Sequence, residues 1–272
     1  MSTTASSASA SGYPAPARRG EPVWEVAQLF PLQGEWTEAE YLALDTNRIV
    51  ELSDGCLDVH LESFDPAPPA PSRPGEPTWE VALLFPWQGD WSEEEYLALT
   101  RRTNRLIELN DGCLEFLPMS TLFHQLLVEF LYLAFKAWVE PRKLGKVLFA
   151  PLQLRLGIGK FRDADILLFR PEHVANPHQR LTGADLAVEI VSPGDTSRER
   201  DLVTKPAEYA RAGIAEYWIV DPEQQRITVL TLDGTFYREH GSFAAGQRAT
   251  SVLLQGFEVA VADVFAAGQG VQ

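Results

Sequence analysis

The chain has 272 residues, of which 45% are hydrophobic and 22% charged, and its formal net charge is −15. This length accommodates one large domain, or a domain with an appendage, and provides ample residues for a core. Strong acidity argues against loose, sequence-independent binding to nucleic acid, because contacts to phosphate need Lys and Arg. No uninterrupted apolar stretch approaches the roughly 18 to 20 residues that a membrane span needs, so we expect no membrane association.

The charge is spread unevenly along the chain. Residues 1–74 carry 11 acidic and 4 basic residues, a balance of −7, which leaves −8 for the longer remainder. A local cluster of basic residues that binds DNA could still exist within residues 75–272. Residues 1–19 are rich in Ser, Ala and Pro and lack the apolar core of a signal peptide, which predicts a disordered tail. Two cysteines and no secretion signal indicate a cytoplasmic location.

An internal repeat fills much of the first half. GEPVWEVAQLFPLQGEWTEAEYLAL begins at Gly20, and GEPTWEVALLFPWQGDWSEEEYLAL begins at Gly75. A solenoid usually needs three or more repeats, so we interpret the two copies as a segmental duplication. The Pro-rich residues 62–74 form a linker between the copies. We predict that residues 20–61 form an appendage, that 75–268 form the main domain, and that deletion of 1–74 leaves a folded core.

Each copy predicts a capped helix followed by a hairpin. Thr37 and Ser92 suit the N-cap position, because each is followed three residues later by Glu. Strands are predicted at 49–52 and 106–109, and Ser-Asp-Gly and Asn-Asp-Gly turns lead into second strands. Cys56 and Cys113 occupy equivalent hairpin positions, and we interpret them as small strand residues rather than as a disulfide or metal site.

The second half predicts an α+β or α/β fold, with a mixed β-sheet flanked by a few helices. The apolar spacing predicts a helix over 121–139, with His124 near its start. A second helix ends near Ala212, with Gly213 as its C-cap. Strands are expected at 147–156, 166–169, 186–191 and 216–220, followed by a hairpin formed by 227–232 and 235–240.

Two of these apolar strands carry carboxylates. Asp165 opens Ile-Leu-Leu-Phe, and Glu189 lies inside Leu-Ala-Val-Glu-Ile-Val. Burial of an ionised carboxylate costs several kcal/mol, as an order of magnitude, unless a cation or strong donors compensate it. Two such carboxylates on neighbouring strands therefore suggest a shared divalent cation. A register slip would make Asp163 the rival of Asp165, although adjacent strand residues point to opposite faces of a sheet.

Several segments in a fixed order carry a family resemblance. They are ELNDGCLEFLPMS, His124 at a helix start, FRDADILLF, VEIVSPGD, the D-x-x-x-K-x-x-x-Y pattern of Asp201, Lys205 and Tyr209, AGIAEYWIVDP and LLQGFEVAVADVF. Over residues 91–266 the chain resembles the Uma-type restriction endonucleases, a branch of the PD-(D/E)XK nuclease superfamily. The resemblance implies a restriction-endonuclease-like core and hydrolysis of DNA phosphodiester bonds.

The resemblance also implies roles for individual residues. Asp165 and Glu189 match the metal-binding carboxylates, and the backbone carbonyl of Ile190 completes the ligand set for Mg²⁺ or Mn²⁺. Lys205 matches a catalytic lysine that has moved from the strand to the following helix. On a continuous helix Asp201, Lys205 and Tyr209 share one face. Pro206 supports another interpretation, in which a helix starts at this proline and Lys205 immediately precedes it.

Each candidate also has a structural interpretation. Asp165 and Glu189 could pair with Arg162 or Lys205 for stability alone. Glu108 could add a carboxylate or pair with Arg105, His124 could be an ordinary helix-start residue, and Tyr209 and Trp218 suit the core. Two basic clusters are the candidates for phosphate contacts, although such clusters are usually solvated faces. The clusters comprise Arg101, Arg102 and Arg105, and Arg142, Lys143 and Lys146.

Three functions remain open at this point. The first is a Mg²⁺-dependent endonuclease acting on DNA. The second is a catalytically silent nuclease-fold protein with a binding or regulatory role, and the third is a metal-dependent hydrolase of another phosphate ester. A homodimer is compatible with the endonuclease, because double-strand cleavage often uses two active sites. The silent protein could use the Trp and Phe residues of its duplicated segment for homo-oligomer contacts.

Overall fold

The computed structural model describes residues 17–44, 46, 49–59, 72–174, 176–178 and 180–269. The chain divides into two compact units, Met1–Leu117 and Pro118–Gln272. Residues 1–16 of the predicted tail and most of the predicted linker, residues 62–71, lie outside the described residues. The compact unit 1 contains both copies of the repeat, and the boundary expected at residues 62–74 stays a prediction.

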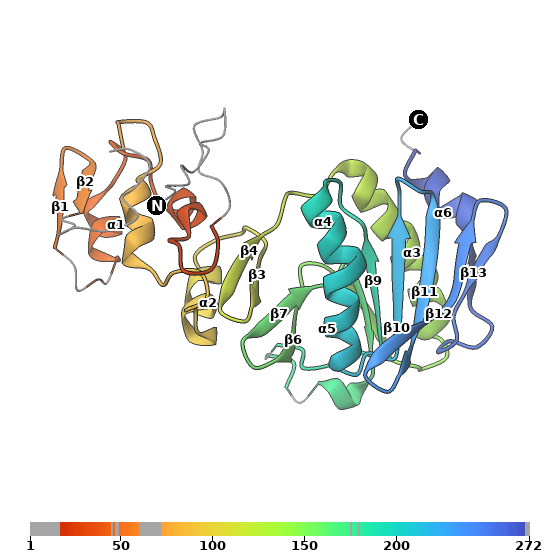
Figure 1. Ribbon diagram of the computed structural model, residues 1–272. Coiled ribbons are helices and arrows are strands. Elements are labelled where there is room, and N and C mark those ends of the chain that lie inside the picture. The colour runs from red at the N-terminus through yellow and green to blue at the C-terminus, as the bar shows by residue number, and fades with distance from the viewer. Residues whose placement is uncertain are drawn as a thin grey trace, which may run out of the picture. The chain divides into compact units, whose positions relative to one another are not determined.

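Unit 1 contains the same four elements twice (Figure 1). Thr37 and Ser92 form the predicted capping boxes, each with its Glu three residues on. Both hairpins form across two-residue turns, in which Asp54 and Asp111 have a φ of 49°. The elements are η1 (Trp24–Leu29), α1 (Glu38–Leu42), β1 (Val50–Ser53) and β2 (Cys56–Val59), then η2 (Trp79–Leu84), α2 (Glu93–Thr100), β3 (Ile107–Asn110) and β4 (Cys113–Phe116).

The two copies share a core in unit 1. Trp24 and Ala27 of the first copy are buried with Trp79, Ala82 and Leu83 of the second. The short 3₁₀ helices η1 and η2, which the sequence analysis did not predict, supply these residues. The two cysteines are both free, as predicted.

The centre of unit 2 is a six-stranded sheet with the strand order β12-β11-β10-β9-β8-β5. Strands β9 and β10 pair in parallel, and the other neighbours pair antiparallel, which makes the predicted mixed sheet. The strands are β5 (Lys146–Phe149), β8 (Ile166–Phe169), β9 (Leu186–Ile190), β10 (Glu216–Asp221), β11 (Arg226–Asp233) and β12 (Phe236–Ala244). A smaller hairpin joins β13 (Arg248–Thr250) to β14 (Glu258–Ala260).

The single strand predicted over 147–156 is wrong. The structure has two strands there, β5 and β6 (Gln153–Gly157), and Pro151 lies between them. Proline has no amide hydrogen to give to a strand ladder, so it separates the two pairings. Strand β5 joins the large sheet, whereas β6 pairs with β7 (Lys160–Asp163).

Helices cover both faces of the large sheet (Figure 1). Helix α3 (Leu122–Val139), with Thr121 as N-cap, and helix α6 (Val261–Ala267) pack against one face around Trp218 and Phe257. By length and composition alone α3 could span a membrane, although polar and charged residues interrupt its apolar sequence. The buried Leu127, Leu131 and Phe135 account for much of its apolar character as core packing. The predicted absence of membrane association stays a prediction.

A helical segment with three parts covers the opposite face, where Tyr209 and Tyr217 are buried. It consists of α4 (Asp195–Glu199), the π-helical turn η4 (Arg200–Thr204) and α5 (Lys205–Arg211). The interpretation that a helix starts at Pro206 is therefore wrong. The wide turn is closed by the Lys205 N–H, which bonds the carbonyl five residues earlier, and the helix continues through the proline. One helical segment thus carries Asp201, Lys205 and Tyr209.

Candidate active site

The strand register places Asp165 and Glu189 opposite each other. In the antiparallel pair β8–β9, Ile166 lies opposite Val188, so Asp165 and Glu189 are the next facing positions. The Asp165 carboxylate also reaches across the strands, where its Oδ2 accepts a 2.7 Å hydrogen bond from the Ile190 N–H. Side chains of directly opposed residues lie on one face of a sheet. Local pairing therefore brings together the two carboxylates singled out in the sequence.

Glu189 is held by two side chains of the helical segment. The Lys205 Nζ lies 3.0 Å from Glu189 Oε1, and the Tyr209 hydroxyl donates a 2.7 Å hydrogen bond to the same oxygen. All three residues are buried, with at most 3% of each exposed. The prediction that Tyr209 lies in the core is confirmed. Its hydroxyl gives it a second role, because it orients the carboxylate.

Asp201 adds a third carboxylate to this cluster. Its Oδ1 lies 3.6 Å from Lys205 Nζ and 3.2 Å from Arg200 Nε, and its Oδ2 accepts a hydrogen bond from the Ser192 N–H. Arg200 was not among the residues chosen from the sequence. Asp201 and Glu189 thus share the Lys205 ammonium, and Asp201 also contacts Arg200.

His124 lies beside Asp165. Its Nε2 is 3.3 Å from Asp165 Oδ1, and its Nδ1 is buried with no hydrogen-bond partner among the described residues. Burial acts to lower the pKa of His124. The hydrogen bond to Asp165, the charges of Asp165 and Asp201 and the Ile190 backbone outweigh it and raise the pKa above its usual value. The structure thus brings His124 into the site, where its imidazole and the Ile190 backbone both contact Asp165.

The donor set fits a hard divalent cation. Mg²⁺ prefers oxygen ligands, keeps several waters and is usually bound by only one or two protein carboxylates. Asp165, whose side chain is 15% exposed, and Glu189 supply these carboxylates, and the Ile190 carbonyl as a third ligand stays a prediction. No group of three or more His, Cys, Asp or Glu residues suited to a metal occurs among the described residues. That finding is compatible with a site of two carboxylates and water.

Other carboxylates named in the sequence have different surroundings. Glu108 is fully buried on β3 in unit 1, and Asp163 is buried at the end of β7 in unit 2. Arg162, considered as a partner for Asp165 or Glu189, binds Glu208 through Nε at 2.7 Å. Lys160 lies 3.0 Å from the same Glu208. Sequence reasoning missed this buried network, because a single Glu on a helix beside Tyr209 has no distinguishing pattern.

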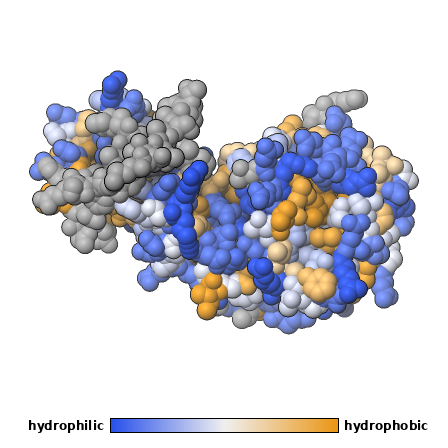
Figure 2. All heavy atoms as spheres, in the orientation of Figure 1, coloured by the Kyte–Doolittle hydropathy of each residue, from blue (hydrophilic) through white to orange (hydrophobic). Residues whose placement is uncertain are grey.

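The two basic clusters lie in different units. Arg101, Arg102 and Arg105 are exposed in unit 1, where Arg105 Nη2 donates a hydrogen bond to Gln28. In unit 2, Arg142 stacks over Trp138, and Lys146 lies 3.2 Å from Glu140; both are exposed, as is Lys143. Phosphate binding by either cluster stays a prediction. Figure 2 shows a largely hydrophilic surface with separate apolar patches on the face that it draws.

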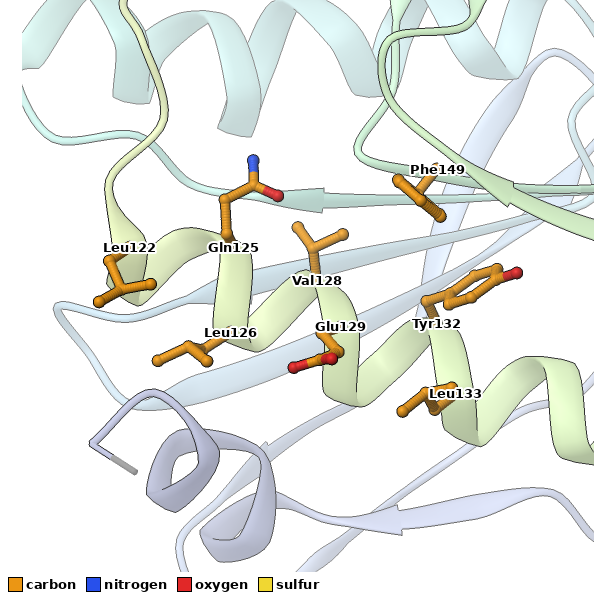
Figure 3. Close-up of a pocket in the computed structure, with 8 residues that line it drawn as sticks. All are labelled: Leu122, Gln125, Leu126, Val128, Glu129, Tyr132, Leu133 and Phe149. Atoms are coloured by element: carbon orange, nitrogen blue, oxygen red, sulfur yellow. The ribbon is translucent and has the colours of Figure 1, made fainter. Parts of the chain in front are cut away.

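One apolar groove lies along the exposed side of α3. It has a volume of about 400 Å³, and Figure 3 shows Phe149 of β5 projecting toward the side chains of the helix. None of the candidate catalytic residues lines it. The residues that line it are Leu122, Gln125, Leu126, Val128, Glu129, Tyr132, Leu133 and Phe149.

Comparison with known proteins assigns the chain to a family. The family model Uma2, described as "putative restriction endonuclease", matches residues 93–262, which include every carboxylate of the site. The chain belongs to the Uma2 family. The resemblance inferred from the sequence is therefore confirmed.

A solved structure agrees with the fold of this Uma2 protein. It is described as a putative nuclease belonging to DUF820 from Anabaena variabilis, and it aligns with a TM-score of 0.53 at 15% identity. The alignment covers 65% of this chain and 99% of that chain. No curated protein matches this chain. These findings support a nuclease fold. They do not identify individual site residues, for which the geometry described above is the evidence.

Proposed function

We propose that this protein is a divalent-metal-dependent endonuclease that hydrolyses phosphodiester bonds of DNA. One observation carries the proposal. Asp165 and Glu189 face each other on adjacent strands, and the ammonium of Lys205 lies 3.0 Å from Glu189. Membership of a family described as restriction endonucleases supports the same reaction class.

Asp165, Glu189 and the Ile190 carbonyl would hold Mg²⁺ or Mn²⁺. When bound, such an ion stabilises the charge that develops on the phosphate and lowers the pKa of a coordinated water. Lys205 contributes a compact positive charge that can orient the attacking water or neutralise a phosphate oxygen. Asp201 and Glu189 hold the Lys205 ammonium from two sides, and the helical segment fixes its stem. Tyr209 keeps Glu189 in place from the same helix.

A catalytically silent binding module is the second candidate. The net charge of −15 favours it, because such a charge weakens contacts with the phosphates of a substrate. The buried position of Lys205 argues for the enzyme. Burying this ammonium beside two carboxylates has a desolvation cost that a purely structural site avoids by using apolar residues.

A plasmid-nicking assay with and without Mg²⁺ or Mn²⁺ separates these candidates. We expect the wild-type protein to nick DNA only with metal, and we expect Asp165→Asn and Glu189→Gln to abolish nicking. Glu216→Gln is the matched control, because Glu216 is also a buried strand glutamate but lies outside the site. Metal-independent nicking, or equal activity in all four proteins, would contradict the proposal. No nicking by the wild type with any metal would favour the silent module.

A further inference from the structure

The two copies of the repeat exchange backbone hydrogen bonds in a reciprocal pattern. The Gly20 N–H bonds the Gln88 carbonyl at 2.7 Å, and the Gly75 N–H bonds the Gln33 carbonyl at 2.7 Å. Equivalent residues of the two copies differ by 55 positions here, so Gly20 corresponds to Gly75 and Gln33 to Gln88. The two bonds therefore join equivalent residues in opposite directions. A second pair repeats the pattern, since Gln33 N–H bonds Glu76 and Gln88 N–H bonds Glu21, each at 2.9 Å.

Side chains follow the same symmetry. Phe30 stacks on Trp36 with centroids 6.0 Å apart, and Phe85 stacks on Trp91 at 6.0 Å. Phe30 and Phe85 meet each other at 5.4 Å, where each copy contributes the same residue. A contact in which residue i meets j′ and residue j meets i′ is the isologous pattern of a twofold dimer.

We propose that the segment from Gly20 to Trp36 and the equivalent segment from Gly75 to Trp91 are the two halves of a homodimer interface, here joined in one chain. The surface of each segment that contacts the other therefore fits a second copy of the same segment. The Uma2 match begins at Glu93, so both segments lie outside the matched region. In this chain the first copy occupies the surface that a second chain would otherwise use.

The two copies differ in the hydrogen bonds that their buried tryptophan indoles make across the contact. The Trp36 Nε1 donates a 2.9 Å hydrogen bond to Thr78 of the other copy. The residue equivalent to Thr78 is Val23, which has no acceptor, and Trp91 Nε1 is buried without a hydrogen-bond partner among the described residues. A pair made of two second copies would satisfy both indoles, whereas a pair of two first copies would satisfy neither. Two second copies should therefore bind each other more tightly than two first copies.

The proposal can be tested in the full-length protein by a substitution that prevents the first copy from binding the second. Ala27 and Ala82 are equivalent, fully buried residues of the shared core, so Asp at either position disrupts that side of the contact. We expect Ala27→Asp to free the second copy and to give twice the molar mass of the wild type in light scattering. Ala82→Asp should also dimerise but about thirtyfold more weakly, because its pair lacks two buried hydrogen bonds.

The double variant Ala27→Asp/Ala82→Asp blocks both surfaces and should keep the wild-type mass. A wild-type mass for Ala27→Asp at its highest soluble concentration, or the opposite order of the two single variants, would overturn the proposal. A second measurement does not depend on a substitution in the core. A protease site inserted between residues 62 and 71 should yield two fragments that co-elute, and separate elution of the first copy would also overturn the proposal.

Discussion

Two buried glutamates on adjacent strands of unit 2 are held in opposite ways. Glu216 of β10 is fully buried, and four neutral donors bind its carboxylate: Trp218 Nε1, the Ser251 hydroxyl and the N–H groups of Val252 and Leu253, at 2.6–2.8 Å. Glu189 of β9 is as deeply placed, but a lysine ammonium and a tyrosine hydroxyl bind it, and a second carboxylate lies nearby.

The difference separates a structural carboxylate from a candidate catalytic one. Glu216 fastens the turn at residues 251–254 to the sheet, and all of its donors are neutral groups of fixed geometry. Glu189 belongs to a cluster that buries an ammonium beside two carboxylates. Burying these charges has a desolvation cost that a structural site can avoid, so the cluster indicates a requirement other than folding. The predictions below test this contrast, from the largest expected effect to the smallest.

Replacing Lys205 should have the largest combined effect on activity and stability. We expect Lys205→Met to reduce nicking by about 10²- to 10³-fold, because an electrostatic stabiliser of the transition state is removed. The same change leaves two buried carboxylates without their shared cation, so it should lower the free energy of unfolding by about 3–5 kcal/mol. Nicking kinetics and urea denaturation measure the two effects.

The double variant Lys205→Met/Glu189→Gln is the control for that substitution. It removes the uncompensated charge at Glu189, so it should recover part of the lost stability while remaining inactive. Activity in this double variant would show that neither the Lys205 ammonium nor the Glu189 carboxylate is needed for nicking.

Replacing Glu216 or Glu189 by Gln should affect different properties: stability for Glu216 and nicking for Glu189. Glu216→Gln replaces an oxygen acceptor by an amide and leaves buried donors without a partner, so we expect a loss of about 1–3 kcal/mol in stability. Its nicking rate should stay near wild type below the melting temperature. Glu189→Gln should lose nicking with a smaller loss of stability. Equal behaviour of the two variants in both assays would remove the distinction between them.

The buried indoles of unit 1 give a smaller, purely structural contrast. Val23→Thr places a hydroxyl where Trp91 lacks an acceptor, and we expect a gain of about 1 kcal/mol in stability. Thr78→Val removes the acceptor of Trp36 and should cost about the same or more. Thermal unfolding checks both variants, and nicking should be unchanged in each. A loss of stability in Val23→Thr would show that the two copies do not pack symmetrically.

The smallest predicted effect is a pH dependence at Glu25. Burial raises the pKa of Glu25 despite an opposing backbone hydrogen bond. A folded-state pKa above the unfolded value contributes stability that is present at low pH and is lost as pH rises through the folded-state pKa. Glu25→Gln should therefore gain more stability relative to wild type at pH 7 than at pH 4. Urea denaturation of both proteins at the two pH values measures this difference, and an equal gain at both pH values would contradict the raised pKa of Glu25.

Local patterns predicted much of the fold. The capping boxes at Thr37 and Ser92, the hairpins and helix α3 follow from residue spacing and turn residues, and they appear as expected. The break between β5 and β6 was missed, because the apolar residues continue on both sides of Pro151. The π-helical turn before Lys205 was missed as well, because the wide turn accommodates Pro206 without any change in the spacing of apolar residues.

The candidate site was predictable to a similar extent. Asp165 and Glu189 stood out because carboxylates interrupt apolar strands, and Lys205 was chosen from the family resemblance. The structure brings Glu189 and Lys205 into contact. Arg200 and the pair formed by Arg162 and Glu208 could not be chosen, since their contacts depend on how the helical segment lies on the sheet. Tertiary packing decides such pairs, and residue spacing in one sequence does not record it.

Isothermal titration of Mg²⁺ and Mn²⁺ into the wild type and into Asp165→Ala/Glu189→Ala tests the central claim most directly. We predict binding by the wild type and no binding by the double variant, with Glu216→Gln binding as the wild type does. Equal binding in all three proteins, or no binding in the wild type, would contradict a metal site at these two carboxylates.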